Sequence, residues 1–340
     1  MSDIHVNQCV RYVKQAVGQV DSSHFALSSE PMAGCKQGEI QVRIVYLSLD
    51  PYQRRQMMPG VVYAQPLKVG DIMVGRAVGR VVQTRNPHFK EGDWVKGNFG
   101  WQQYATIPGV SAEKIELDGL PPSMFLGALG SPGMTAWVGL HAVAAIKPGE
   151  TVVISAATGA VGSVAVALAR TVGCRTVGIA GGQAKCEHAL ETLGYDACVD
   201  YRRGDFRDAL LAATPAGVDV DFENVGGPIF DCVLERLNDF GRVALCGLIS
   251  QYNNAEPAGL RNIDKVLNHN ATIAGFRVTN YVSRYAEALV ELKRLVRAGE
   301  IARTETIVEG LDRAPEAFIG LFQGKNLGKL LVRVAEDGQC

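Results

Sequence analysis

The sequence lacks an excess of charge of either sign. Its 340 residues include 34 Lys and Arg against 35 Asp and Glu, a formal net charge of −1. Near-neutral chains without a basic block are not typical of proteins that bind nucleic acid or an anionic membrane. No apolar run reaches the roughly 18 residues of a membrane-spanning helix, and the opening residues MSDIHVNQCV show no signal-peptide pattern. We therefore expect a cytoplasmic protein.

The cysteines lack the spacing of a metal or redox motif. No two of the eight stand in a C-x-x-C arrangement, and several lie in strand-like apolar runs such as Val243–Cys246. We interpret them as buried, reduced thiols, as in cytosolic proteins. They are Cys9, Cys35, Cys174, Cys186, Cys198, Cys232, Cys246 and Cys340.

Glycine, by contrast, is abundant, with 38 residues where about 7% is usual. Such a level without a repeat period indicates many tight turns. Residues 1–122 read as short strands interrupted by Gly and Pro, for example at Ile40–Leu47, Val74–Val82 and Asp93–Lys96. This part of the sequence predicts a compact β-rich domain.

From residue 123 onward, strand-like and helix-like segments alternate. Strands are expected at Thr151–Ser155, Arg175–Ala180, Ala197–Asp200, Val218–Phe222, Gly241–Gly247 and Thr272–Phe276. Helices are expected at Met124–Ala145 with an interruption at Ser131–Gly133, and at Ala160–Thr171, Gln183–Leu193, Asp205–Ala213, Pro228–Leu237 and Tyr281–Ala298. The alternation predicts an α/β fold with a doubly wound parallel sheet and right-handed crossovers.

The last residues leave this alternation. Strands are expected at Thr304–Val308 and Gly328–Val334, with a helix at Ala314–Gln323 between them. These segments are candidates to pack back on the β-rich part. We therefore predict one domain from residues 123–303 and another from residues 1–122 together with 304–340.

A glycine-rich loop, residues 157–162 (ATGAVG), joins the strand Thr151–Ser155 to the following helix. It has the A-x-G-x-x-G form of a dinucleotide-binding loop, in the strand–loop–helix context that such a loop needs. Gly159 would let the backbone approach a pyrophosphate, and Gly162 would let the helix pack closely on the strand. The N-terminus of that helix offers free N–H groups to phosphate. The loop therefore predicts a bound dinucleotide.

The second strand of the alternation lacks the acidic residue that an NAD site usually carries about 20 residues after the loop. It ends in Gly181–Gly182, and Lys185 follows within one helical turn. Tyr201, Arg202 and Arg203 follow the third strand. A cation and a hydroxyl in place of a carboxylate favour a 2′-phosphate. The sequence therefore predicts NADPH, with a solvated surface lysine as the alternative interpretation of Lys185.

The ligands of a catalytic zinc are also missing. A β-rich domain followed by a dinucleotide domain is the order of zinc alcohol dehydrogenases, and a catalytic zinc needs three Cys, His or acidic ligands. Ser48 stands at a strand end where a cysteine would serve, the turn at 74–77 has no Gly-His-Glu, and residues 80–120 contain no four-cysteine cluster. We therefore expect no metal. A hydride enzyme without a Lewis acid suits substrates whose own conjugated carbonyl accepts the charge.

Several motifs together resemble one known family. They are Leu47–Tyr52 (LSLDPY), Gly97–Tyr104, Gly130–Ala136 (GSPGMTA), Ala156–Ser163 (AATGAVGS), Phe222–Gly227 (FENVGG), Cys246–Asn253 (CGLISQYN) and Gly324–Lys329 (GKNLGK). Along nearly its whole length the chain resembles the zinc-independent medium-chain dehydrogenase/reductases, in the branch of prostaglandin reductases, plant alkenal double-bond reductases and bacterial curcumin reductases. The run from Gly181 to Cys186 is most similar to the curcumin-reductase type. The resemblance implies a GroES-like β-rich domain, a Rossmann domain and a homodimer that associates through the cofactor domains.

Carried over position by position, the resemblance also implies a site. The residues expected to bind NADPH are Gly159, Ala160, Val161, Gly162, Lys185, Tyr201, Asn224, Cys246, Gly247, Leu248, Ile249, Ser250, Tyr252, Phe276, Arg277, Val278 and Asn326. Tyr52 and Tyr252 are expected to line the substrate side. Two departures leave the substrate open: Ser131 stands where relatives often have methionine, and Arg277 brings a charge into a segment that is usually apolar.

The chemistry that the resemblance implies is reduction of the C=C bond of an α,β-unsaturated ketone or aldehyde, with hydride passing from NADPH to the β-carbon. Negative charge then develops on the carbonyl oxygen, which a positioned hydroxyl stabilises. Tyr252, beyond the C-terminal end of the fifth strand, is the candidate catalytic residue. Two alternatives stay open, a zinc-free quinone reductase of the same superfamily and a non-catalytic NADPH-binding protein with a structural or regulatory role. The apolar stretch at residues 263–273 fits either a core or an interface.

Overall fold

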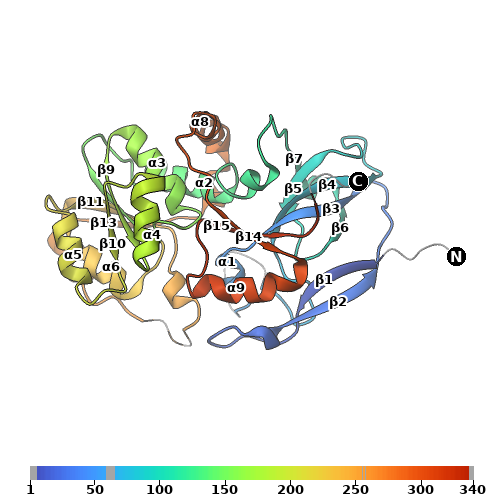
Figure 1. Ribbon diagram of the computed structural model, residues 1–340, viewed down its shortest axis with the longest axis horizontal. Coiled ribbons are helices and arrows are strands. Elements are labelled where there is room, and N and C mark those ends of the chain that lie inside the picture. The colour runs from blue at the N-terminus through green and yellow to red at the C-terminus, as the bar shows by residue number, and fades with distance from the viewer. Residues whose placement is uncertain (1–5, 59–65, 255, 257, 337–340) are drawn as a thin grey trace. The chain divides into compact units, whose positions relative to one another are not determined.

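The chain divides into two compact units in the computed structural model, which describes residues 6–58, 66–254, 256 and 258–336. Unit 1 comprises Met1–Leu126, Glu305–Asn326 and Leu330–Cys340, and unit 2 comprises Gly127–Thr304 and Leu327–Lys329 (Figure 1). Unit 1 is therefore built from both ends of the chain, whereas unit 2 is built almost entirely from its middle.

Unit 1 contains a seven-stranded sheet in which β14, β15, β3, β4, β5 and β7 are neighbours in that order and β6 pairs with β3. The bounds are β3 (Glu39–Ser48), β4 (Arg76–Thr84), β5 (Trp94–Asn98), β6 (Tyr104–Pro108), β7 (Ala112–Lys114), β14 (Glu305–Glu309) and β15 (Lys329–Arg333). A separate antiparallel pair is formed by β1 (Val6–Tyr12) and β2 (Phe25–Pro31). Leu331 of β15 pairs with Ser48 of β3, so the last strand packs on the N-terminal sheet.

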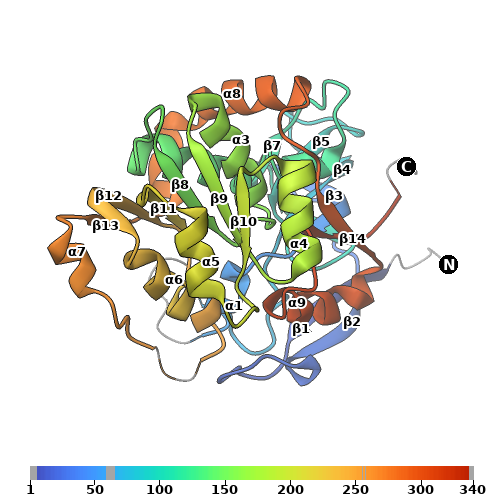
Figure 2. The ribbon, with the colours of Figure 1, turned by 60° about the vertical axis from the view of Figure 1, so that its left-hand side comes forward.

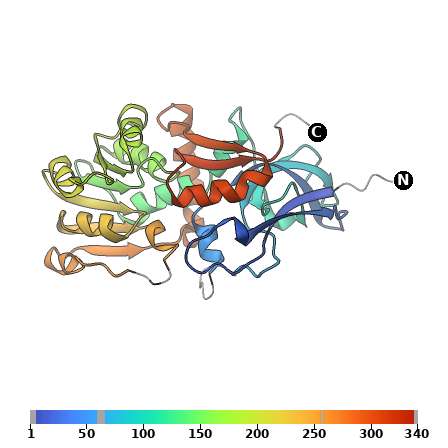
Figure 3. The ribbon, with the colours of Figure 1, turned by 60° about the horizontal axis from the view of Figure 1, so that its bottom comes forward.

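The core of unit 1 centres on a group of aromatic rings. Trp101 is fully buried and stacks on Phe25 with 5.7 Å between ring centres, while Phe318 of α9 (Ala314–Phe322) meets it edge-on at 5.4 Å. Such aromatic pairs add stability beyond the area they bury. Figure 3 shows α9 beside β14 and β15. The other helical segments of this unit are short: η1 (Ser22–His24), α1 (Tyr52–Gln56), η2 (Gly109–Ser111), η3 (Pro122–Leu126) and η8 (Leu311–Arg313).

Unit 2 contains a sheet of six parallel strands in the order β10-β9-β8-β11-β12-β13 (Figure 2). The bounds are β8 (Thr151–Ser155), β9 (Arg175–Ala180), β10 (Ala197–Asp200), β11 (Val218–Glu223), β12 (Leu237–Leu245) and β13 (Thr272–Gly275). The predicted doubly wound sheet is confirmed. The strand order reverses between β8 and β11, and open sheets of this kind bind ligands beyond the C-terminal ends of the strands at such a point.

Helices connect and cover these strands. They are α2 (Ser131–Trp137) with the π-helical η4 (Val138–Val143), α3 (Gly162–Val172), α4 (Gln183–His188) with the π-helical η5 (Ala189–Leu193), α5 (Phe206–Ala213), α6 (Gly227–Leu234), η6 (Ile249–Gln251), α7 (Asp264–Asn268), η7 (Val278–Arg284) and α8 (Tyr285–Arg297). Leu210 of α5 and Phe230 of α6 share one buried cluster with Val153 and Val177 of the sheet. The α5 and α6 face of the sheet is therefore covered by an apolar layer.

Several predicted helices have the wrong bounds, and α8 for example begins at Tyr285 instead of Tyr281. The helix expected over residues 124–145 begins only at Ser131, where Pro132 lies in its first turn. Proline lacks an N–H, so it suits a helix start and does not interrupt a helix that begins there. The helix expected to end at Leu237 ends at Leu234, because Leu237 already pairs with Val218 as part of β12.

The seven cysteines that the structure describes are free thiols, and Cys340 lies outside the described residues. In the described part of the chain, no helix has the length and apolar character needed to cross a bilayer.

Candidate active site

The loop after β8 forms a compact turn through its own backbone. The N–H of Gly159 donates to the carbonyl oxygen of Ala156 at 2.8 Å, and Ala156 adopts a φ of +50°. A Cβ atom at Gly162 would lie 2.6 Å from the carbonyl oxygens of Ala156 and Ala157, so only glycine fits at the start of α3. The hydroxyl of the buried Tyr195 donates to the carbonyl oxygen of Gly162 at 2.9 Å and fixes the far side of the turn.

Three backbone N–H groups of this loop donate to no oxygen in the part of the chain that the structure describes. They belong to Ala160, Val161 and Gly162, and no side chain caps the N-terminus of α3. Unbonded N–H groups at a helix N-terminus attract phosphate, and the helix dipole adds to the attraction. The loop can therefore hold the pyrophosphate of a dinucleotide at the residues that the sequence singled out.

Residues 327–329 return to unit 2 beside this loop. The N–H of Gly328 donates to the carbonyl oxygen of Thr158 at 2.8 Å. Gly328 has a φ of +67°, and a Cβ there would lie 2.0 Å from the carbonyl oxygen of Thr304. Asn326, a predicted cofactor residue, immediately precedes this segment. Sequence reasoning did not single out Gly328, although the GKNLGK motif contains it.

Small residues and cations lie together at the ends of β9 and β10. A Cβ at Gly181 would lie 2.7 Å from the hydroxyl of Tyr201, and a Cβ at Gly182 would lie 3.7 Å from the guanidinium of Arg202. The pKa of Lys185 is lowered first by burial and then by the positive charge of Arg202. Two neighbouring cations favour a bound anion, because the anion relieves their repulsion. Lys185 and Tyr201 thus occupy a place that can hold a 2′-phosphate.

Of the two arginines after β10, only Arg202 belongs to this group. Arg203 forms an exposed ion pair with Asp205 at 2.8 Å. The carboxylate of Asp200 accepts the N–H of Gly182 at 2.7 Å and the N–H of Arg202 at 3.0 Å, which fixes the turn that carries the cation. The sequence pattern could not separate the two arginines, since they are adjacent and chemically identical.

The loop after β12 is bonded to the loop after β11. The hydroxyl of Ser250 donates to the carbonyl oxygen of Val225 at 2.6 Å. The side-chain amide of Asn224 donates to the carbonyl oxygen of Ser155 at 2.8 Å, so it joins the end of β11 to the end of β8. The predicted residues Asn224 and Ser250 are therefore brought to the point where the strand order reverses.

Tyr252 lies half-buried in the loop that follows β12. Its hydroxyl oxygen accepts the N–H of Leu248 at 3.2 Å and would lie 3.3 Å from a Cβ at Gly247. Because the oxygen accepts this bond, the hydroxyl hydrogen serves a different acceptor. A tyrosine hydroxyl is the type of donor that stabilises an oxyanion.

Three further predicted residues follow β13. The ring of Phe276 meets the ring of Phe222 edge-on, with 6.3 Å between their centres. Arg277 is exposed, and the carbonyl oxygen of Val278 accepts the hydroxyl of Tyr285 at 3.1 Å. Phe276 therefore has a packing contact in unit 2, whereas Arg277 offers a charge at its surface.

Two carboxyl groups that the sequence did not single out lie inside unit 2. Asp221 and Glu223 of β11 have no exposed surface. One carboxylate oxygen of Glu223 accepts the N–H of Val225 and, at 2.5 Å, the N–H of Gly226. Burial raises the pKa of Glu223 to about 7, although these N–H donors act in the opposite direction. Glu223 thus shapes the turn after β11 and titrates near neutrality.

Asp221 lies among apolar neighbours. Its register partners Val153 and Val243 belong to the core cluster under α5 and α6, and within the described residues its carboxyl oxygens have no hydrogen-bond partner. Burial, and then the charge of Glu223, raise the pKa of Asp221 well above its usual range. A carboxyl in such surroundings is held neutral. The alternating acids of the strand VDVDFE were the available sequence signal.

Tyr52, the predicted substrate residue of unit 1, is the first residue of α1. The side chain of the buried Gln53 donates to the carbonyl oxygens of Ser48 and Val74, each at 3.0 Å, and so connects the end of β3 to the chain before β4. The guanidinium of Arg76 lies 5.9 Å from the centre of the Tyr52 ring. The structure thus places one aromatic ring and one cation side by side at this end of the sheet.

The positions where a catalytic zinc would need its ligands lie at the same strand ends. The Ser48 hydroxyl donates to the carboxylate of Asp50. Within residues 6–58, 66–254, 256 and 258–336, no three His, Cys, Asp or Glu side chains gather as metal ligands would.

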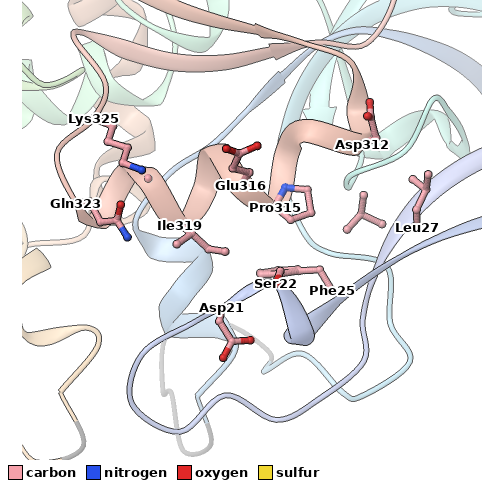
Figure 4. Close-up of a pocket in the computed structure, with 12 residues that line it drawn as sticks. Asp21, Ser22, Phe25, Leu27, Asp312, Pro315, Glu316, Ile319, Gln323 and Lys325 are labelled. Atoms are coloured by element: carbon pink, nitrogen blue, oxygen red, sulfur yellow. The ribbon is translucent and has the colours of Figure 1, made fainter.

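A groove with a volume of about 430 Å³ also lies in unit 1, with η1 and the start of β2 on one wall and α9 on the other (Figure 4). Its lining includes the carboxylates of Asp21, Asp312 and Glu316 against a single cation, Lys325. None of the predicted site residues lines it. The excess of carboxylates is unsuitable for a dinucleotide phosphate.

A phosphate-binding loop at the reversal point of a doubly wound sheet, in a chain that also carries a β-rich unit, defines a dinucleotide-dependent oxidoreductase. Comparison with known proteins identifies its family. Two family models match the chain. The model described as the N-terminal domain of oxidoreductase matches residues 8–115, and the model described as zinc-binding dehydrogenase matches residues 160–294.

The relatives extend this match over most of the chain. The NADPH-dependent curcumin reductase of Escherichia coli is 42% identical over 92% of this chain and 93% of its own. The NADP⁺-dependent 2-alkenal reductase of Nicotiana tabacum is 38% identical over 88% of both chains. The crystal structure of CurA from Vibrio vulnificus in complex with NADPH superimposes with a TM-score of 0.92 at 39% identity, covering 97% of this chain and 99% of that one.

The chain therefore belongs to the zinc-independent medium-chain dehydrogenase/reductases, in the branch of curcumin, alkenal and prostaglandin reductases. The resemblance found in the sequence motifs is confirmed. The fold is the expected pair of a GroES-like β-rich domain and a Rossmann domain.

Proposed function

We propose that this protein reduces the carbon–carbon double bond of α,β-unsaturated ketones and aldehydes, with NADPH as the hydride donor. Relatives that reduce curcumin and 2-alkenals support the reaction class. The observation in this chain that carries the proposal is the combination of unbonded N–H groups at the start of α3 with the neighbouring cations Lys185 and Arg202. This combination suits a dinucleotide that bears an additional phosphate.

The residues proposed to hold NADPH follow from that geometry. Residues Gly159–Gly162 would take the pyrophosphate, and Lys185 with Tyr201 and Arg202 would take the 2′-phosphate. Asn224, the Cys246–Tyr252 loop, residues 276–278 and Asn326 are proposed for the nicotinamide half, as the family resemblance implies.

The reaction needs stabilisation of negative charge on the substrate's carbonyl oxygen. When bound, NADPH supplies the hydride that is added to the β-carbon. Tyr252 is proposed to donate its hydroxyl hydrogen bond to the oxygen as that oxygen becomes an enolate, while the oxygen of Tyr252 accepts the N–H of Leu248. Solvent then protonates the α-carbon. Tyr52 is proposed to contact the substrate from unit 1.

Replacing Tyr252 with phenylalanine tests this role. We expect the Tyr252→Phe variant to lose about 100-fold in kcat for a simple enone, because one oxyanion donor is removed, with little change in KM for NADPH. Steady-state NADPH consumption measures both constants. Tyr104→Phe, the same chemical change on β6, is the matched control. Unchanged enone turnover in Tyr252→Phe would remove the residue from the mechanism.

The substrate preference of the wild-type enzyme separates enone reduction from the quinone-reductase alternative. A wild-type enzyme that consumes NADPH with a benzoquinone far faster than with any enone would favour it. Binding of NADPH without consumption on either class would favour a non-catalytic role. The single most informative screen is therefore a panel of enones that differ in chain length and aromaticity, with one benzoquinone included.

The remaining proposals concern the domain bounds, the cellular location and the oligomeric state. We propose that residues 123–303 form the NADPH-binding domain and that residues 1–122 with 304–340 form the substrate domain. The free thiols support a cytoplasmic location. A homodimer through unit 2 is supported by the exposed apolar side chains of Phe240, Ile263 and Leu267 near the end strand β13. Sedimentation velocity measures that association.

A further inference from the structure

Glu223 is the last residue of β11, and its carboxylate holds the turn that follows the strand. The side chain has no exposed surface. One carboxylate oxygen accepts the N–H of Val225 and, at 2.5 Å, the N–H of Gly226. Gly226 has a φ of +79°, and a Cβ there would lie 2.8 Å from the side chain of Leu248. The carboxylate thus satisfies two backbone donors in a turn that packs closely against the loop after β12.

These two bonds also decide where the carbonyl groups of the turn point. In a planar trans peptide, the N–H of one residue and the carbonyl group of the residue before it point in opposite directions. Because the N–H of Val225 points to Glu223, the carbonyl group of Asn224 points away from Glu223. Its oxygen accepts the N–H of Ile249 at 3.1 Å. The carboxylate therefore acts on the loop after β12 through a peptide group that it orients.

The next peptide group repeats the arrangement. The N–H of Gly226 points to Glu223, so the carbonyl group of Val225 points the other way. Its oxygen accepts the N–H of Ser250 at 3.0 Å and the hydroxyl of Ser250 at 2.6 Å. Two successive peptide groups thus connect one buried carboxylate to the loop that carries the predicted nicotinamide residues.

The backbone of Glu223 holds the start of the same loop. Its carbonyl oxygen accepts the N–H of Cys246 at 2.8 Å and the N–H of Gly247 at 3.1 Å. The following residue, Leu248, donates its N–H to the hydroxyl oxygen of Tyr252 at 3.2 Å. Residues 246–250 are therefore fixed at the start by the carbonyl group of Glu223 and at the end by peptide groups that its carboxylate orients. The position of the Tyr252 hydroxyl depends on this stretch, and such support is what a catalytic group requires.

We propose that Glu223 is a positioning residue for hydride transfer, whose carboxylate fixes the loops that orient Tyr252 and the nicotinamide half of NADPH. The proposal rests on the proposed function, in which Asn224 and the Cys246–Tyr252 loop take that half. As a fully buried side chain, Glu223 acts through the two loops and not by contact with the ligands. The loop after β8 has its own supports, among them the bond from Tyr195 to Gly162. Binding of the adenosine half is therefore independent of Glu223.

The test compares two ligands in the wild type and three variants. The ligands are NADPH and 2′,5′-ADP, which carries the 2′-phosphate but no nicotinamide. Glu223→Gln keeps an oxygen that can accept both N–H groups, whereas Glu223→Met has a similar length and no oxygen. Asp221→Val is the matched control, because it removes an equally buried carboxyl group from the same strand, and that group accepts no hydrogen bond from the residues that the structure describes. Calorimetry measures the dissociation constants, and NADPH consumption with one simple enone measures kcat.

We expect Glu223→Met to weaken NADPH binding about 10-fold and 2′,5′-ADP binding less than about 2-fold, because only the nicotinamide loops lose their support. Its kcat should fall about 10- to 100-fold, because a misplaced hydride donor and oxyanion donor cost more in the transition state than in binding. Glu223→Gln should keep kcat and NADPH affinity within about 3-fold of the wild type, since its amide oxygen accepts the same bonds. Asp221→Val should change both by less than about 2-fold, because it orients no peptide group of the loops.

Other outcomes overturn the proposal. Equal weakening of NADPH and 2′,5′-ADP in Glu223→Met would assign Glu223 to the support of the whole unit, and wild-type affinity and kcat would remove it from positioning. A loss in Glu223→Gln as large as in Glu223→Met would contradict the role of the acceptor oxygen. The same pattern in Asp221→Val would show that any change in the core of the strand has this effect.

A second variant covers the case in which Glu223→Met does not fold. Ser250→Ala removes the hydroxyl bond to the carbonyl oxygen of Val225. It should weaken NADPH binding about 2- to 3-fold and leave 2′,5′-ADP binding unchanged, as loss of one hydrogen bond near solvent does. Unchanged binding of NADPH would overturn the proposed path. If the wild type binds NADPH but reduces no enone, the proposed reaction fails, while the two dissociation constants still decide the role of Glu223.

Discussion

The ends of β9 and β11 lie on the same edge of one parallel sheet, yet basic side chains gather at the first and carboxyl groups at the second. The half-buried Lys185 after β9 and the exposed Arg202 after the neighbouring strand β10 lie near each other. On β11, Asp221 and Glu223 are fully buried, and burial raises the pKa of each. One strand end thus accumulates cations near water, and the other accumulates acids away from it.

The difference shows two uses of charge at a ligand-binding edge. Cations that keep part of their surface in water can meet an incoming anion, which relieves the effect of burial and of Arg202 on the charge of Lys185. Acids that are buried must become neutral or be bonded by N–H groups, as Glu223 is by Val225 and Gly226. The first arrangement serves recognition, whereas the second serves the shape of the loop, and each can be disturbed separately.

The largest effect is expected at the cationic end. Lys185→Ala should weaken NADPH binding about 10- to 100-fold, because a charge-assisted bond to the 2′-phosphate is lost, and should change NADH binding less than about 2-fold. Fluorescence titration with both cofactors measures the two dissociation constants. Arg203→Ala, whose side chain is paired with exposed Asp205, is the control and should change neither. Equal weakening for NADPH and NADH would place the 2′-phosphate elsewhere.

An intermediate effect is expected at the acidic end. The pKa of Glu223 rises from 4.5 to about 7 on burial, so the folded protein binds a proton there that the unfolded chain has released. Stability is therefore highest below pH 4.5 for this group and falls as the pH rises to about 7, by on the order of 1 kcal/mol per pH unit. Glu223→Gln, whose amide oxygen can still accept both N–H groups, should flatten that slope.

Urea unfolding between pH 5 and pH 8 compares the two slopes, and the difference between wild type and variant removes the contribution of other titrating groups. The same slope in both proteins would show that Glu223 keeps an ordinary pKa. Asp221→Asn offers a second measurement, since the pKa of Asp221 is raised in the same direction by burial and by Glu223.

The smallest effect is expected when a negative charge beside Lys185 and Arg202 is removed. Asp200 is a carboxylate within this group, and its oxygen accepts the N–H groups of Gly182 and Arg202. Asp200→Asn keeps an acceptor for both and removes one negative charge. We expect NADPH to bind about 2- to 3-fold more tightly at low salt, with the gain disappearing at high salt. Weaker binding of NADPH and NADH alike would show that the charge of Asp200 is needed for the turn itself.

Local pattern was sufficient for much of unit 2. The strands Thr151–Ser155, Arg175–Ala180 and Ala197–Asp200 have the predicted bounds, because each is a short run enriched in β-branched or apolar residues and bounded by turn or cap residues. The dinucleotide loop was recognisable for the same reason, since its glycines, strand and helix are contiguous. The helix start at Ser131 was missed because proline both begins and breaks helices, and the sequence alone did not decide which.

Features that depend on contacts between distant segments were not predictable. The bond from Gly328 to Thr158 joins residues from opposite halves of the chain. The pairing of Arg76 with Tyr52 and the burial of Asp221 likewise require the packed structure, because single residues of these types are usually solvated. The roles of the individual site residues stay predictions until the variants are measured.

The position of β15 has a consequence for synthesis. This strand pairs with β3, and Phe318 of α9 fills the core against Trp101, so unit 1 is complete only after residues 314–333 have been synthesised. Residues 127–304, by contrast, are contiguous and leave the ribosome as nearly a whole unit. Residues 127–304 can therefore fold first, while residues 46–48 of β3 still lack their partner strand β15, and an unpaired strand edge favours aggregation until residues 329–333 have been synthesised.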